Sequence, residues 1–198
     1  MNNIFSSISS FTHNLVETVV KSGDHVIDAT IGNGNDTLFL AQKVGVNGKV
    51  YGFDIQKIAI ENTTLLLNSQ GLLAQTNLIH TGHENMKKYV TTSVKAVMFN
   101  LGYLPKGDHE IITLPQTTIS ALGQALDLLL PKGIITVTVY TGHEGGKNEE
   151  KAVNAFLKEL DKKHWDVLKW SFVNRNQNAP YLIIIYRRGG LDIENKTS

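Results

Sequence analysis

Cysteine is absent from the 198 residues of the chain. Its absence excludes a disulfide framework, a thiolate zinc site and a cysteine nucleophile, and it fits a reducing compartment. Proline occurs four times and hydrophobic residues make up 41% of the chain, so neither a collagen-like nor a disordered protein is expected. The net charge of +1 excludes a strongly basic nucleic-acid carrier. A nucleic-acid partner would therefore need local patches of charge.

Long hydrophobic runs are also missing. The strongest run, Tyr181 to Tyr186, has the length of a strand and falls far short of the ~20 apolar residues of a membrane span. The N-terminal segment lacks the charged start and apolar stretch of a signal peptide. We therefore expect a cytoplasmic protein that does not enter a membrane. Its length predicts a single domain over residues 1–198, with a core from about 24 to 188 and a frayed polar tail at 189–198.

Apolar runs of strand length alternate with helical patterns through the first two thirds of the chain. The runs rich in Val, Ile and Thr predict strands, and apolar residues at three- and four-residue spacing predict helices. The expected strands are His25–Thr30, Lys49–Asp54, Asn77–Thr81, Val94–Leu101 and Gly133–Tyr140, and the expected helices are about 11–22, Asp36–Val44, Gln56–Gln70, Glu84–Val90 and Pro115–Leu130. Such alternation is typical of a parallel sheet with helices on both faces.

The last third of the chain has a different order. A helix over Lys147–Lys163 is followed by two strands, Trp165–Val173 and Tyr181–Arg188, with a short connection between them. A connection of that length cannot hold a crossover helix, so the two strands must be antiparallel. The predicted fold class is therefore α/β, with five parallel strands plus a C-terminal antiparallel hairpin in one seven-stranded sheet.

A turn rich in Gly and Asn follows the first expected strand. Such a turn allows backbone N–H groups to approach a ligand at the positive end of a helix, although it could also be only a tight turn. Asp54, about 20 residues further on, closes the next strand, where a carboxylate can accept both hydroxyls of an adenosine ribose. Asp36 could equally cap the helix. The candidate cofactor residues here are Thr30, Gly32, Asn33, Gly34, Asn35, Asp36, Thr37, Asp54, Ile55 and Gln56.

Asp28 helps to choose between two adenosine cofactors. It ends the first strand beside the glycine-rich turn, where its charge would repel a pyrophosphate but would favour the cationic amino group and sulfonium of S-adenosylmethionine. The third glycine of a dinucleotide fingerprint would fall on Thr37. The residues therefore favour S-adenosylmethionine over NAD. After the third strand, His83 and Glu84 are candidates for the adenine edge, or a turn that begins a helix.

The fourth strand ends in a segment that could receive an amine. Asn100 and the carbonyl of Leu101 could accept hydrogen bonds from an amine and orient its lone pair, and Tyr103 offers a flat face on which a base could stack. Leu104 would complete the apolar side of this position. The alternative is structural, because Asn, Gly and Pro are common in turns.

Two further loops contain polar and aromatic candidates. After the fifth strand, His143 could accept a proton, or it could form part of a stacking wall with Tyr140. The loop Asn174–Pro180 contains Arg175 and Asn178, which suit phosphate and base edges but could also form a plain connection.

With the segments DATIGNGNDT, GFD and NLGYLP followed by Gly-Asp, the chain resembles a class I S-adenosylmethionine-dependent methyltransferase, and more closely the small bacterial family named for putative rRNA methylases. The resemblance extends from about Asp24 to about Arg188. It departs from the broad class at Thr30, where many members have glycine, and at His83, where an acidic residue often binds adenine. It implies a Rossmann-like fold and S-adenosylmethionine as cofactor.

The resemblance further implies that the methyl acceptor is the aminomethyl nitrogen of a tRNA wobble uridine, presented by the anticodon stem-loop. Asn100 and Leu101 would orient that nitrogen, Asp108, His143 or water would take its proton, and no metal is required. A chain this small could dimerise to build enough surface for RNA, so a homodimer is expected. The alternatives are methylation of rRNA or a small amine, a nicotinamide-dependent oxidoreductase, and an RNA-binding protein without catalysis.

Overall fold

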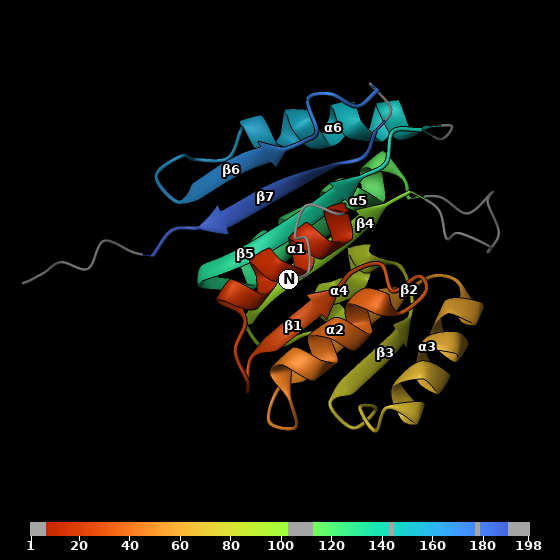
Figure 1. Cartoon of the computed structure of the whole chain (residues 1–198). Helices are drawn as coiled ribbons and strands as arrows, with labels where there is room; N and C mark the ends of the chain where they lie inside the picture. The colour runs from red at the N-terminus through yellow and green to blue at the C-terminus, as the bar shows by residue number, and fades with distance from the viewer. Residues whose placement is uncertain (1–6, 103–112, 143–144, 177–178, 190–198) are drawn as a thin grey trace, which may run out of the picture.

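The computed structural model describes residues 7–102, 113–142, 145–176 and 179–189 (Figure 1). In this part of the chain seven strands form one sheet in the order β3-β2-β1-β4-β5-β7-β6. The strands are β1 (His25–Asp28), β2 (Lys49–Asp54), β3 (Thr76–His80), β4 (Val94–Leu101), β5 (Leu129–Val139), β6 (Trp165–Trp170) and β7 (Tyr181–Arg187). Most of the expected polar tail, residues 190–198, lies outside the described residues.

Strands β1 to β5 are parallel to one another, and β7 is antiparallel to both β5 and β6. The predicted α/β fold class is therefore confirmed, including the antiparallel hairpin. The second strand of that hairpin, β7, inserts between β5 and β6. The strand order reverses between β1 and β4, which places the ends of these two strands at the position where doubly wound sheets bind ligands.

Helices cover both faces of the sheet. They are α1 (Ile8–Val19), α2 (Asn35–Val44), α3 (Lys57–Ser69), the 3₁₀ turn η1 (His83–Asn85), α4 (Met86–Tyr89), α5 (Pro115–Leu128) and α6 (Gly146–Lys158). Leu40 of α2 belongs to the core layer that α1, α2 and α3 cover, and Leu122 of α5 belongs to the layer under α4, α5 and α6. Val26 and Ile27 of β1 point into opposite layers, as adjacent strand residues must.

Several element boundaries differ from the prediction: β1 ends at Asp28 rather than Thr30, α6 at Lys158 rather than Lys163, and β6 at Trp170 rather than Val173. Two further differences have a clear local cause. The expected helix over Pro115–Leu130 ends at Leu128, and β5 begins at once with Leu129 paired to Val94. Leu130 precedes Pro131, and a residue before proline is disfavoured in helical conformation. The first helix begins at Ile8 rather than at about residue 11, because Ser7 caps it by accepting a hydrogen bond from the Ser10 amide.

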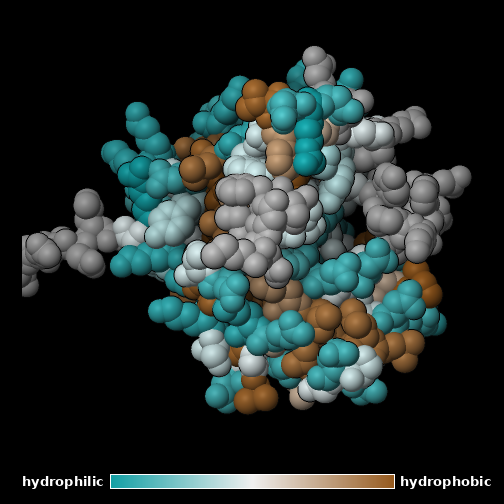
Figure 2. All heavy atoms as spheres, in the orientation of Figure 1, coloured by the Kyte–Doolittle hydropathy of each residue, from teal (hydrophilic) through white to brown (hydrophobic). Residues whose placement is uncertain are grey.

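The surface that carries α1, α2 and α3 mixes hydrophilic and hydrophobic residues (Figure 2). Brown, hydrophobic atoms gather on the side where α3 lies, and exposed hydrophobic side chains there include Ile58 and Leu65. Within the described ranges, none of the helices has the length and hydrophobicity needed to cross a bilayer.

Candidate active site

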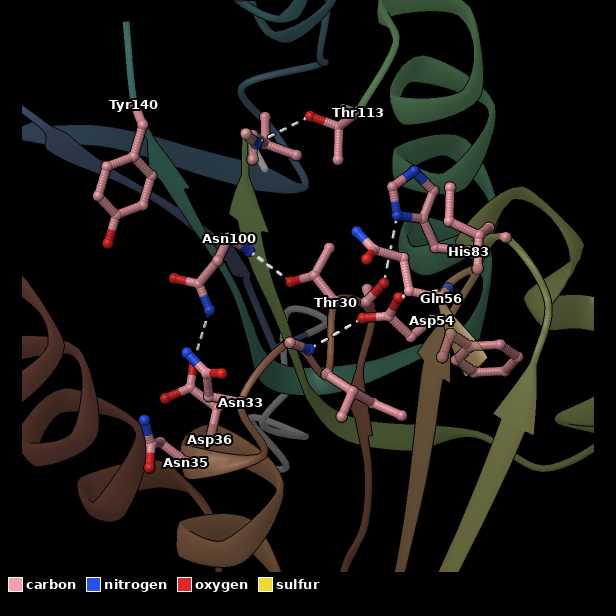
Figure 3. A pocket seen from close by; sticks show the side chains of 18 of the residues that line it. Thr30, Asn33, Asn35, Asp36, Asp54, Gln56, His83, Asn100, Thr113 and Tyr140 are labelled. Carbon is pink, nitrogen blue, oxygen red and sulfur yellow. Dashed lines mark hydrogen bonds between the residues drawn. The ribbon is translucent and has the colours of Figure 1, made fainter. Parts of the chain in front are cut away.

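A cavity of about 810 Å³ opens where the parallel strands end. Its walls are the loops that follow β1, β2, β3, β4 and β5, together with the first turns of α1 (Figure 3). This volume is ample for a nucleoside-sized ligand. The cavity brings together the following predicted residues: Thr30, Gly32, Asn33, Asn35, Asp36, Asp54, Ile55, Gln56, His83, Glu84, Asn100, Leu101 and Tyr140.

The glycine-rich loop depends on left-handed backbone conformations. Gly32 has a φ of 54° and Gly34 a φ of 77°, a region that side chains other than glycine rarely adopt. Gly34 does not line the cavity; it precedes α2 and packs against α3. A Cβ on Gly34 would lie 2.5 Å from Thr63 Oγ1, so the loop is also pressed closely against that helix. Glycine at this position is thus required by shape as well as by conformation.

Asp28 is buried beneath the loop rather than facing the cofactor cavity, which corrects its expected position. Its carboxylate accepts hydrogen bonds from Thr37 Oγ1 at 2.6 Å and from the Thr30 amide at 3.1 Å. Neither Asp28 nor Thr37 lines the cavity. β1 ends at Asp28 and the chain then turns. The Asp28 side chain packs beneath this turn and stabilises it through its hydrogen bonds with Thr30 and Thr37.

Burial, with a smaller effect from the charge of Asp36, raises the pKa of Asp28 from 3.8 to about 7. Asp28 is therefore a weak source of negative charge near neutral pH. The carboxylates that do line the cavity are Asp36, Asp54 and Glu84. They make the cavity acidic, and an acidic cavity favours a cationic ligand over a pyrophosphate. The sequence indicated Asp28 as the source of the preference for a cationic cofactor, but in the structure this preference comes from the three carboxylates that line the cavity.

Asp54 lies at the end of β2 and connects two loops. It accepts a hydrogen bond from the Gly32 amide at 2.9 Å through one oxygen and from the Gln56 amide at 2.8 Å through the other. Each carboxylate oxygen has a second lone pair, so the residue retains acceptor capacity toward the cavity. This arrangement fits a carboxylate that receives ribose hydroxyls.

His83 is buried at the third loop, with its ring edge against Phe99. Its Nδ1 lies 3.2 Å from the carbonyl oxygen of Ala29. A carbonyl only accepts, so Nδ1 must carry the proton, and Nε2 is then an acceptor. Burial lowers the pKa of His83, which keeps the ring neutral. The residue could therefore accept a hydrogen bond from an exocyclic amine such as that of adenine.

Asn100, near the end of β4, is held at two points. Its backbone amide donates to Thr30 Oγ1 at 2.7 Å, and its side-chain Nδ2 donates to Asp36 Oδ2 at 2.6 Å. Figure 3 shows the Asn100 side chain between the glycine-rich loop and Tyr140. Desolvation, and then the charge of Asp36, raise the pKa of Tyr140. The site therefore contains a fixed amide beside a neutral phenol.

Sequence reasoning missed the contribution of α1. Ser9, Ser10 and His13 line the cavity, and His13 Nε2 lies 2.6 Å from Asp36 Oδ1. The available signal was a polar stripe, since residues three and four apart share one helix face.

A buried carboxylate on α6 was missed as well. Glu149, 2% exposed, accepts hydrogen bonds from Thr113 Oγ1 at 2.7 Å and from Thr118 Oγ1 at 2.6 Å. It connects α5 and α6 to the chain just after residue 112. Acidic residues and lysines alternate along this helix, a pattern that is typical of a solvent-exposed face. The local sequence therefore did not indicate that Glu149 is buried.

The remaining candidates lie elsewhere. Arg175 does not line the cavity; its guanidinium stacks over the ring of Phe172 at 3.6 Å. Tyr103, Leu104, Asp108, His143 and Asn178 lie outside the described residues. Among the residues that are described, no three His, Asp or Glu side chains gather as potential metal ligands.

Comparison with known proteins places this geometry in a family. The family model described as Putative rRNA methylase matches residues 50–186. The tRNA (mnm(5)s(2)U34)-methyltransferase, chloroplastic, of Arabidopsis thaliana is 42% identical over 186 residues, which cover 89% of this chain and 68% of that protein.

Two solved structures agree with this assignment. A putative rRNA-methylase from Clostridium thermocellum is 50% identical, with a TM-score of 0.88 over 90% of this chain and 96% of that one. A putative methyltransferase from Streptococcus mutans, solved in complex with SAH, is 36% identical, with a TM-score of 0.83 over 92% of this chain and 98% of that one. A class I methyltransferase fold, a cavity at its strand ends and a matching family model agree, and the chain belongs to the Putative rRNA methylase family.

Proposed function

We propose that this protein uses S-adenosylmethionine to methylate the aminomethyl nitrogen of 5-aminomethyl-(2-thio)uridine at the tRNA wobble position, giving the 5-methylaminomethyl product. The name of the Arabidopsis relative supports the acceptor, and the SAH complex of the Streptococcus relative supports the cofactor. The observation that carries the proposal is Asn100, a fixed amide in an acidic cavity at the end of β4.

The cavity residues fit the cofactor. Asp54 would receive the ribose hydroxyls, the loop of residues 30–36 would hold the amino-acid end, and His83 would accept from the adenine amine. Asp36, Asp54 and Glu84 supply the negative charge that a sulfonium favours. When bound, S-adenosylmethionine supplies an electrophilic methyl group.

The acceptor amine sets the remaining requirements. A free alkylamine is mostly protonated near neutral pH, and the ammonium has no lone pair with which to attack. Desolvation against Tyr103 and Leu104, together with the adjacent sulfonium charge, would lower the pKa of such an amine. Asn100 and the Leu101 carbonyl would then hold the nitrogen in line with the methyl group, and positioning of this kind is worth up to ~7–11 kcal/mol.

Proton removal remains with three candidates: Asp108, His143 and solvent water. When tRNA is bound, the wobble uracil would be contacted by Tyr103, Leu104 and Tyr140. The rest of the anticodon stem-loop would be contacted by Arg175 and Asn178.

The proposal includes a homodimer, because a second subunit would enlarge the RNA-binding surface. Light scattering of the purified protein, alone and with an anticodon stem-loop, tests the dimer separately from catalysis.

Nucleoside mass spectrometry tests the proposed acceptor. A strain that lacks the gene should accumulate 5-aminomethyl-2-thiouridine in its tRNA and lose the methylated form. The purified protein should then transfer labelled methyl groups to that tRNA and not to rRNA or free alkylamines. Transfer to rRNA or to a small amine instead would support the alternative substrates and reject the tRNA assignment.

Asn100→Ala tests the residue on which the proposal rests. Losing the amide should misplace the acceptor and lower the single-turnover rate by up to ~10²-fold, with S-adenosylmethionine affinity changed much less. Asn77→Ala is the matched control, because Asn77 is an exposed residue of β3 away from the cavity lining. A parental rate in Asn100→Ala would remove Asn100 from the site.

A further inference from the structure

Three elements that are distant in sequence meet through one chain of hydrogen bonds. His13 of α1 contacts Asp36 Oδ1 at 2.6 Å, and Asp36 Oδ2 accepts from Asn100 Nδ2 of β4 at 2.6 Å. The exposed side-chain fractions are 27% for His13 and 13% for Asp36. The chain of contacts therefore extends from the cavity rim to the residue that we place beside the methyl acceptor.

The direction of each hydrogen bond follows from the carboxylate between them. An ionised carboxylate only accepts, so the end of the Asn100 amide that faces it must be the NH₂ group, and His13 Nε2 must carry a proton. The Asn100 oxygen is consequently directed elsewhere. Figure 3 shows that oxygen on the side of Tyr140, away from Asp36.

The orientation of this amide decides whether it helps or hinders an amine. A carbonyl oxygen accepts an N–H of the amine and leaves its lone pair available for attack. An amide flipped by half a turn would present N–H groups, which would donate to that lone pair and occupy it. The two orientations differ little in shape, so the partners of the amide select between them.

His13 is itself well fixed. Its ring stacks on Phe39 of α2 with centroids 4.0 Å apart and an angle of 4° between the planes. Asp36 and Phe39 are three residues apart on the same helix, so one face of α2 both stacks the imidazole and bonds to it. Because one Asp36 oxygen is held by His13, the other is kept toward Asn100.

We infer that His13 and Asp36 are positioning residues that fix the Asn100 amide with its oxygen toward the methyl acceptor. The inference rests on the proposed function for the identity of the acceptor, but the hydrogen-bond chain exists without it. It gives the N-terminal helix a role in the reaction, although that helix lies outside the segment matched by the family model.

Two substitutions of His13 separate the hydrogen bond from the stacking. His13→Phe keeps an aromatic ring against Phe39 and removes the donor to Asp36. His13→Gln restores an N–H donor at similar reach. We expect the single-turnover methylation rate of hypomodified tRNA to fall at least ~10-fold in His13→Phe and to recover in His13→Gln, with cofactor affinity of both within about threefold of the parent.

Nuclear magnetic resonance of the full-length protein supplies a readout that needs no substrate. The side-chain NH₂ signals of Asn100, identified by their loss in Asn100→Ala, should shift toward those of a solvated amide in His13→Phe and return in His13→Gln. Unchanged Asn100 signals in His13→Phe would overturn the inference. A parental methylation rate in His13→Phe, or equal losses in the Phe and Gln variants, would overturn it as well.

The same experiments distinguish an error in the proposed function from an error in the role of His13. If the parental protein transfers no methyl group to tRNA, the acceptor assignment is wrong, and the Asn100 signals alone decide whether His13 orients the amide. A loss of cofactor affinity in His13→Phe that matches its loss of rate would make His13 a cofactor ligand and would overturn the positioning role.

Discussion

Gly102 and Thr113 meet although ten residues separate them in the chain. The Gly102 amide donates to Thr113 Oγ1 at 2.9 Å, and the Thr113 amide donates to the Gly102 carbonyl, also at 2.9 Å. Thr113 Oγ1 in turn donates to the buried carboxylate of Glu149. One hydroxyl therefore closes the distance between the end of β4 and the residues just before α5, and it links both to α6.

Thr113→Val should loosen this closure. It removes the acceptor for Gly102 and one of the two hydroxyl donors to Glu149, and leaving a buried polar group without its partner costs about 1–3 kcal/mol. We expect a loss of that size in the free energy of unfolding, measured by urea titration, together with slower methyl transfer. Thr64→Val, which removes an intrahelical bond to the Ile60 carbonyl in α3, is the matched control. Equal effects in the two variants would contradict the closure.

Asp54→Ala should weaken cofactor binding. It removes the carboxylate that faces the cavity and the acceptor for the Gly32 and Gln56 amides. Hydrogen bonds to a charged group are worth about 1.5–3 kcal/mol, which corresponds to a loss of roughly 10- to 150-fold in S-adenosylmethionine affinity. Calorimetry on the folded variant checks this value, with Asp127→Ala, which removes an exposed ion pair to Lys87, as the control. Unchanged affinity in the Asp54 variant would exclude it from the cofactor site.

Gly34→Ala should cost more than backbone strain alone. Gly34 and Gly71 both have positive φ, at 77° and 67°, but a Cβ at Gly71 meets nothing within 4 Å, whereas at Gly34 it approaches Thr63. Gly71→Ala should therefore show only the strain, about 1 kcal/mol, and Gly34→Ala a larger loss. The double variant Gly34→Ala with Thr63→Ala should recover part of the difference. Equal thermal stability of the two single variants would show that α3 does not press on the loop.

Asp28 should make stability depend on pH. Its pKa is raised to about 7 in the folded protein from 3.8, so the folded state holds a proton that the unfolded state has lost between about pH 4 and pH 7. The contribution of Asp28 to the free energy of unfolding is therefore greatest below about pH 4 and decreases as the pH rises to about 7. Relative to the parent, Asp28→Asn should therefore gain stability over that interval, by up to about 4 kcal/mol. Urea titrations of both proteins across the interval measure the gain.

One result of the urea titrations would contradict the raised pKa of Asp28. A difference between the parent and Asp28→Asn that stays constant with pH would mean that the buried carboxyl titrates normally. The measurement is a difference between two proteins because carboxylates distant from Asp28 contribute equally to both.

Local sequence patterns were enough to predict the strands of the sheet and most of the helices that cover it. Strand-type runs such as Val94–Leu101 are buried on both sides, and the short connection before Tyr181 left the antiparallel pairing as the sole geometry. The helix that begins at Pro115 was recognisable because proline suits the first helical position, whereas its end depended on the pairing of Leu129 with Val94, a contact between distant residues.

The site was predictable where a loop follows a strand and less so where elements converge. Asp54 and Asn100 end parallel strands, so topology alone directs them to one edge. Asp28 ends a strand too, but whether its side chain turns toward the cavity or under the loop depends on the hydroxyl of Thr37. The polar stripe on α1 could have indicated His13 as a surface residue, but its pairing with Asp36, which lies 23 residues away on another helix, could not be predicted.

The insertion of β7 between β5 and β6 has a consequence for synthesis of the chain. β6 leaves the ribosome before β7, yet within the described sheet β6 pairs with β7 alone. Until residues 181–187 emerge, β5 presents an open edge and β6 has no strand to join, so both can pair wrongly with other chains. The parallel strands that form the cavity can assemble earlier. The slowest and most aggregation-prone moment of folding should therefore come last, when β7 docks between its two neighbours.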